Sequence, residues 1–134
     1  MTKTISFLLF FSLCYTVIGQ NNSIKQSDLI GCWKYYPEEK KFFPNMSVYR
    51  PCNHESFPSR RAMRGRFKMN FSANGKCSYL TTGPTDTNLM KPGKWTLDSS
   101  NNEVEIFDLE MNLIRKFKII RLEKDLLGIK TNLE

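Results

Sequence analysis

The sequence has only one histidine, His54, among its 134 residues. Histidine is the side chain most often used as a general base, and a zinc site needs three or four convergent ligands. His54 stands close to Cys52 and Glu55, and such a trio suits zinc binding or a nucleophile paired with a base. We expect Cys52 to form a disulfide rather than to bind zinc or act as a nucleophile. We therefore expect no metal site, no catalytic residues, no cofactor and no enzymatic activity.

Helical periodicity and a membrane-length apolar run are also missing. No stretch of useful length repeats its apolar residues at the helical period. The apolar run at residues 5–13 is shorter than the about 20 residues that cross a bilayer. With Lys3 before it and small or polar residues at 17–20 after it, the run predicts a secretory signal peptide over residues 1–19. We expect an exported protein, periplasmic or secreted, with a polar lead-in at residues 20–28.

Cysteine is scarce, at four residues. Cys14 lies in the predicted signal, where the bulky Leu13 disfavours acylation as a lipoprotein. Export leaves Cys32, Cys52 and Cys77, so an oxidising compartment predicts one disulfide and one free thiol. Three pairings are open, and we favour Cys52–Cys77 because Cys32 lies in a predicted core strand. Closing that loop of about 25 residues would stabilise the domain by roughly 3 kcal/mol.

Acidic residues are outnumbered, since 13 Asp and Glu against 20 Lys and Arg give a net charge of +7. An excess of this sign favours peripheral contact with anionic envelope surfaces, or an anionic ligand. A basic cluster at residues 60–68 is interpreted either as part of a solvated outer surface or as an anion site at the open end of the β-barrel that the strand pattern below predicts. Nucleic acid is not an expected partner, because the chain is predicted to be exported and has no recognised nucleic-acid reader.

What the chain does contain is a succession of short segments with β character. Alternation at residues 66–72 places Phe67, Met69 and Phe71 on one face of a strand. Asn74-Gly75 then predicts a tight hairpin, because both turn positions need positive φ. Residues 37–63 contain four of the six prolines and are expected to be largely irregular. Strands are expected at residues 30–36, 48–50, 66–72, 76–82, 94–97, 103–107, 113–122 and 126–130.

These strands predict a single all-β domain over residues 29–134. Consecutive antiparallel strands form a meander, and closing a meander removes its exposed edges. We therefore expect one antiparallel up-and-down β-barrel of about eight strands, with an open sandwich as the alternative.

The opening Gly31-Cys32-Trp33 resembles the Gly-x-Trp motif of lipocalins, and the second half is similar to small lipocalin-like domains of exported bacterial proteins. The resemblance covers most of residues 29–131 and implies a calycin-type cup with a central cavity and no catalytic apparatus. It makes Gly31 and Trp33 structural residues, with Trp33 at the closed end and Arg121 over its ring in a cation–π contact. The similarity rests further on Ser59-Arg60-Arg61, Asn74 to Tyr79, Gly93 to Leu97, Ile119 to Leu122 and Asp125 to Leu127.

The chain departs from lipocalins in being shorter and in lacking their usual C-terminal helix, so a barrel filled with side chains is an alternative to an open cup. The resemblance implies an exported binding module that buries a small apolar or amphipathic molecule, with basic residues favouring an acidic head group. The alternative is an envelope structural, interaction or inhibitor-like protein with a filled barrel and no small ligand. The expected ligand-binding residues, which cover the open end or line its entrance, are Phe42, Phe43, Tyr49, Phe57, Arg60, Arg61 and Arg64.

Overall fold

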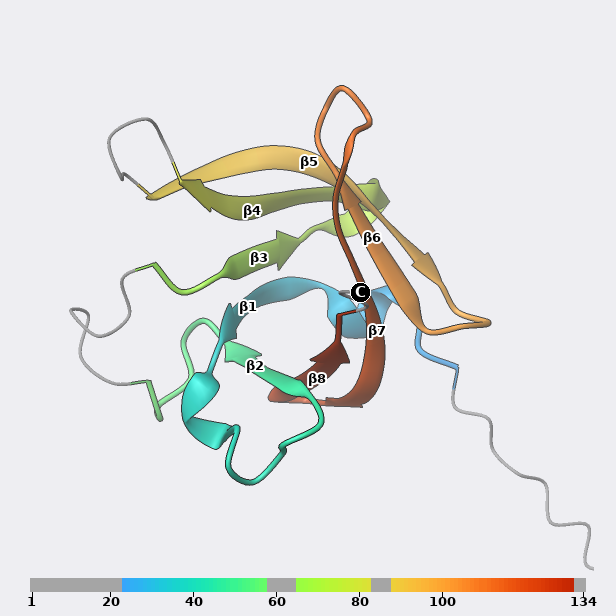
Figure 1. Cartoon of the computed structure of the whole chain (residues 1–134). Helices are drawn as coiled ribbons and strands as arrows, with labels where there is room; N and C mark the ends of the chain where they lie inside the picture. Colours follow the sequence, from blue (N-terminus) through green and yellow to red (C-terminus); the bar gives the residue numbers. More distant parts are fainter. Residues whose placement is uncertain (1–22, 58–64, 83–87, 132–134) are drawn as a thin grey trace, which may run out of the picture.

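The computed structural model describes residues 23–57, 65–82 and 88–131, which form one closed antiparallel barrel of eight strands (Figure 1). The expected fold class is thereby confirmed, while the predicted signal peptide lies outside the described residues. Within these ranges, no helix is long and apolar enough to span a bilayer. The elements are α1 (Gln26–Leu29), β1 (Gly31–Tyr35), η1 (Pro37–Glu39), β2 (Ser47–Pro51), β3 (Lys68–Phe71), η2 (Ala73–Gly75), β4 (Lys76–Thr82), β5 (Asn88–Asp98), β6 (Glu103–Phe107), β7 (Leu113–Glu123) and β8 (Leu126–Lys130).

The strand order follows the chain from β3 to β8 and changes at the first two strands. β1 lies between β2 and β3, and β2 closes the barrel by pairing with β8. All of these pairs are antiparallel, so β2 and β3 run parallel to each other on either side of β1. The chain between β2 and β3 therefore has to pass from the end of the barrel where β2 finishes to the opposite end, where β3 begins.

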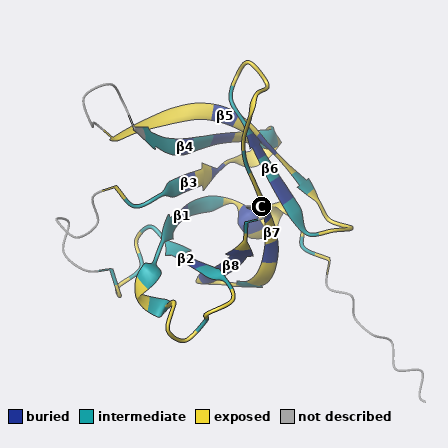
Figure 2. Ribbon diagram, viewed as in Figure 1, coloured by how far each residue is buried: buried dark blue, intermediate teal, exposed yellow. Residues whose placement is uncertain are grey.

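The barrel interior is filled by large apolar side chains. Buried and exposed positions alternate along most strands (Figure 2), and the predicted alternation of Phe67, Met69 and Phe71 is confirmed, with all three packed in or against the core. β8 is buried on both faces, because the segment before β2 covers its outer side at Gly128 through Met46. The fully buried side chains of the interior include Tyr49, Met69, Phe71, Trp95, Val104, Ile106, Phe117, Leu127 and Ile129.

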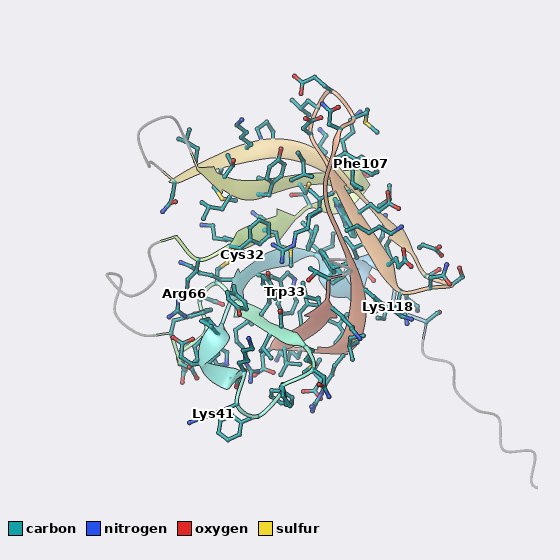
Figure 3. All side chains as sticks on the ribbon, in the orientation of Figure 1. Cys32, Trp33, Lys41, Arg66, Phe107 and Lys118 are labelled. Carbon is teal, nitrogen blue, oxygen red and sulfur yellow. A yellow bond between two sulfur atoms is a disulfide. The ribbon has the colours of Figure 1, made fainter. Side chains whose placement is uncertain are left out.

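Helix α1 and Trp33 close one end of the barrel. Leu29, the last residue of α1, is fully buried, and its carbonyl oxygen accepts a hydrogen bond of 3.0 Å from Trp33 Nε1. Trp33 lies inside the ring of strands, whereas Lys118 lies on its outside (Figure 3). Gly31, which lies between Leu29 and Trp33 in the chain, has a φ of 131°, a conformation that residues with a Cβ rarely adopt.

Arg121 does not lie over Trp33, so that expectation from the lipocalin resemblance is wrong. Its guanidinium lies 5.5 Å from the ring centroid of Phe43 and forms an ion pair with Glu123. The cause is a register shift in β7 between Ile119 and Arg121. The extra residue turns Arg121 to the outer wall, where it stands opposite Gly128.

The disulfide joins Cys32 to Cys52, so the predicted Cys52–Cys77 pairing is wrong. Cys32 faces outward from β1, and Cys52 follows β2 directly beside it, with a Cα–Cα distance of 5.4 Å. Cys77 faces inward from β4, where it is buried as a free thiol. The disulfide therefore fastens the start of the long connection to β1, and it suits an oxidising compartment.

The predicted Asn74-Gly75 hairpin is confirmed. Both residues have positive φ, at 63° and 71°, as a tight turn between twisted strands requires. The turn joins β3 to β4, and the register of this pair places Met69 opposite Tyr79 in the core.

Candidate functional site

Three aromatic residues and one arginine gather at the end of the barrel opposite α1. Tyr35 ends β1, Tyr49 comes from β2, Phe67 precedes β3, and Arg115 lies near the start of β7. The Tyr35 and Tyr49 ring centroids are 5.4 Å apart, and Phe67 stands edge-on to Tyr49 at 6.5 Å. We call this group of four residues the mouth site.

Arg115 occupies the centre of the mouth site. Its Nη2 donates a hydrogen bond of 2.8 Å to Tyr49 Oη, and its Cζ lies 4.0 Å from the Phe67 ring centroid and 5.8 Å from that of Tyr49. A guanidinium carries five N–H donors. No carboxylate among the described residues forms an ion pair with Arg115. The side chain is half-buried, so it combines a desolvated face with donors that are free to bind an anion.

Strand register explains why this arginine points inward. Arg115 stands opposite Ile106, and Phe117 stands opposite Val104 on the same face of the β6–β7 pair. Ile106, Val104 and Phe117 are all buried. Sequence reasoning missed Arg115, although alternation along residues 115–119 would have identified it as a charged residue on the core face of a strand.

Tyr49 supplies a second polar group to the mouth site. Burial raises the pKa of its phenol, and the positive charge of Arg115 opposes that shift. The hydroxyl therefore stays protonated at neutral pH. It accepts from Arg115 and retains its own proton to donate. A phenol and a guanidinium side by side are suited to the two oxygens of a carboxylate or to a phosphate.

The mouth site is shallow. One step further into the barrel along the same strands lie Trp33, Met69 and Phe117, which are each at most 4% exposed. A neighbouring surface hollow of about 450 Å³ lies between the β4–β5 and β6–β7 hairpins, which diverge at the top of Figure 1. Its lining includes Tyr79, Leu109 and Ile114, the residue next to Arg115.

The hairpins diverge because β5 extends beyond the segment that pairs with β6. β5 pairs with β4 from Asn88 to Lys94 but with β6 only from Lys94 to Asp98. The edge of β5 that faces the hollow is therefore unpaired over its first residues. This geometry leaves apolar side chains exposed near the mouth; they are Leu89, Met90, Leu109, Met111, Leu113 and Ile114.

Of the residues expected from the sequence to bind ligand, Tyr49 reaches the mouth site. Phe43 packs against Arg121 on the outer wall, and Phe42 is 68% exposed with Lys41 over its ring. Phe57 packs edge-on against Tyr36 at 5.3 Å. The candidates Arg60, Arg61 and Arg64 lie outside the described residues.

The His54 region forms a charged cluster on the outer wall. Arg50 forms a bidentate pair with Glu39 and also lies 3.6 Å from Asp125, whose other oxygen is 3.6 Å from His54 Nε2. The Glu39 hydrogen bond raises the pKa of Arg50. Among the described residues, no group of three or more His, Cys, Asp or Glu side chains is placed to hold a metal ion.

Comparisons with models of protein families, with curated protein sequences and with solved structures yield no match to this chain.

Proposed function

We propose that this protein is an exported, lipocalin-like binding module that holds a small amphipathic acid at the mouth of its barrel. The observation that carries the proposal is Arg115, an inward-facing guanidinium stacked on Phe67 with no carboxylate partner among the described residues. Placing a cation on the core face of a strand is unfavourable unless an anion compensates it. An acidic ligand supplies that anion.

The filled interior sets the expected binding mode. The head group meets Arg115 and Tyr49, while the apolar part lies against Ile114 and Leu109 in the hollow between the hairpins. The depth of the mouth favours a short or bent apolar part over a long chain buried along the barrel axis. Hydrogen bonds that involve a charged group contribute about 1.5–3 kcal/mol, so the acid is expected to bind roughly ten- to a hundredfold more tightly than its neutral analogue.

The test compares octanoate with octanol, which share an apolar chain and differ in charge. Wild type is expected to bind octanoate more tightly by that factor in a calorimetric titration at neutral pH. Arg115→Met keeps an unbranched side chain and removes the charge, and it should abolish the preference for the acid. Arg121→Met is the matched control, because Arg121 also lies over an aromatic ring but on the outer wall. Equal affinity of wild type for both compounds, or an equal loss in both variants, would refute the proposal.

A second candidate function is interaction with another protein or surface in the envelope, with no small ligand. It is favoured by the filled core together with the apolar residues exposed on the two diverging hairpins, such as Leu109 and Met111. This alternative predicts no saturable binding of either octanoate or octanol. It also predicts that Met111→Ser and Leu109→Ser weaken association with the partner, whereas Arg115→Met leaves that association unchanged.

A further inference from the structure

The outer wall of four adjacent strands carries lysines in directly opposed pairs. The strands β1, β3, β4 and β5 are consecutive around the barrel. Lys34 on β1 stands opposite Lys68 on β3, and Lys76 on β4 stands opposite Lys94 on β5. Their neighbours along each strand, such as Trp33, Met69, Cys77 and Trp95, are buried, so the lysines face outward. We call these four residues the lysine face.

Such pairs are unfavourable in an isolated sheet. Like charges placed directly opposite each other on neighbouring strands destabilise the pair. None of the four lysines forms an ion pair with a described carboxylate. Asp98 is the only acidic residue within these four strands, and its carboxylate already accepts hydrogen bonds from Ser100 and Asn101.

Lys34 shows the electrostatic consequence. Its pKa is lowered, first by partial burial and then by the positive charges of Lys68 and Arg66. Arg66 forms an ion pair with Glu38, which compensates part of its charge. Its contribution to the lowered pKa of Lys34 is accordingly the smallest of the three.

The opposite wall of the barrel is arranged differently. On β7, Lys116 forms ion pairs with Glu103 at 3.1 Å and Glu105 at 3.7 Å, and these carboxylates raise its pKa. Lys118 faces Lys130, but on its other side it stands opposite Glu103. Lys116 and Lys118 each stand opposite a glutamate of β6, whereas no acidic residue stands opposite the four lysines of the lysine face in the described strand pairs.

We propose that the lysine face binds a linear polyanionic polysaccharide. The Met69–Tyr79 register places Lys68 level with residue 80, four residues from Lys76. At about 3.4 Å per residue along a strand and 4.8 Å between strands, Lys68 and Lys76, the nearest lysines of the two pairs, are roughly 14 Å apart. A small anion reaches one pair, whereas a chain with repeated anionic groups spans both.

The residues between the two pairs favour a glycan over other polyanions. Asn70 stands opposite Ser78 there, and Thr96 lies beside Lys94, so the face offers an amide and hydroxyls to sugar hydroxyl groups. The strands' outward positions supply no aromatic ring for stacking nucleic-acid bases. The convex barrel wall meets a flat bilayer over a narrow strip, whereas a flexible chain follows its curvature.

The experiment measures binding of heparin, a sulfated polysaccharide, to the whole protein across a range of salt concentrations. The variants are Lys34→Gln with Lys68→Gln, Lys76→Gln with Lys94→Gln, and the control Lys118→Gln with Lys130→Gln. All three remove two positive charges from an opposed pair, so net charge changes equally. Each lysine-face variant is expected to weaken binding on the order of tenfold and to lower the salt slope by about two. The control is expected to change either quantity much less.

Three outcomes would overturn the proposal. Equal losses in all three double variants would show a response to net charge alone. Failure of wild type to bind heparin at low salt would rule out a polyanionic polysaccharide as the ligand of the lysine face. Tighter binding of single-stranded DNA or of phosphatidylglycerol vesicles than of heparin, with the same lysine dependence, would assign the face to a different polyanion.

Stability provides an independent readout of the same surface. In low-salt buffer without polyanion, Lys34→Gln with Lys68→Gln is expected to raise Tm by about 1–4 °C, because the opposed charges are removed. A lowered Tm would show that these lysines stabilise the wall, which would contradict the electrostatic basis of the proposal. Arg115→Met should leave heparin binding unchanged, so failure of the mouth proposal is distinguishable from failure of this one.

Discussion

Substitution of Gly93 by alanine tests the close approach of β5 to β6 at the point where the hairpins diverge. Gly93 is the last residue of β5 before the pairing with β6 begins. A Cβ built there would collide with the backbone oxygen of Phe107 and would lie 2.9 Å from Tyr79 Cε1. Carbon–oxygen contacts are normally no shorter than about 3.3 Å. The obstructing atom belongs to the backbone of β6, so relief requires the two strands to separate.

The magnitude follows from three contributions. Overpacking a tight site costs about 1–3 kcal/mol, and loss of a ladder hydrogen bond at the end of the β5–β6 pair adds about 1 kcal/mol. Alanine restricts the unfolded chain and offsets about 0.4–1 kcal/mol of this. The expected net loss is about 1–3.5 kcal/mol in the free energy of unfolding, and the middle of that range corresponds to a fall in Tm of roughly 10 °C for a domain of this size.

Gly128→Ala is the matched control for this substitution. Its Cβ would collide only with the thioether end of Met46, whose Cε lies 2.8 Å away. A long, unbranched side chain rotates out of the way, so the expected change is within about 1 kcal/mol. Urea unfolding followed by tryptophan fluorescence measures both variants. If Gly93→Ala were as stable as Gly128→Ala, the strand spacing at Phe107 described above would be wrong.

Three further predictions concern the cysteines. Replacing both Cys32 and Cys52 by serine should lower the free energy of unfolding by about 3 kcal/mol, because the disulfide closes a loop of 20 residues. In contrast, a Cys77→Ser variant should keep that bond, as mass spectrometry after alkylation would show. Burial raises the pKa of Cys77 from 9.0 to about 11, so its contribution to stability is fully present below pH 9 and is lost as pH rises towards 11. This loss, about 2–3 kcal/mol, should be absent in Cys77→Ala, and equal alkaline profiles for wild type and variant would contradict it.

Local sequence pattern was sufficient to predict most strands. The predicted strands at residues 103–107 and 126–130 agree with β6 and β8 at both ends, and the Asn74-Gly75 turn has the expected backbone conformation. These features depend on alternation and on turn chemistry, which act within a few residues. β5 is longer than predicted because its first residues pair with β4 as far as Thr82, a contact that alternation in β5 alone does not reveal.

Features that depend on strand neighbours were not predicted. The position of β1 between β2 and β3 brings Cys32 beside Cys52, and no local pattern encodes that adjacency. The disulfide prediction set Cys32 aside because it lies in a core strand, although the alternation around Trp33 places Cys32 on the outer face of that strand. A single extra residue in β7 likewise turned Arg121 outward, and that register shift depends on pairing with β8.

The candidate site was predictable in part. Tyr49 was identified as an aromatic residue near the open end, and it does lie in the mouth site. Charge density alone favours the basic cluster before residue 69 and does not single out Arg115. The more informative signal was one arginine in phase with Phe117 and Ile119 on the buried face of a strand.

The most direct test of the mouth site follows the arginine Nε–Hε resonances by NMR while octanoate is added to the whole protein. The Arg115 resonance, assigned through Arg115→Met, is expected to shift saturably together with the amides of Tyr49 and Phe67. Arg50, Arg66 and Arg121, which are already paired with acidic residues, should remain unchanged. An unchanged Arg115 resonance at saturating octanoate, or a shift confined to the other arginines, would contradict the account.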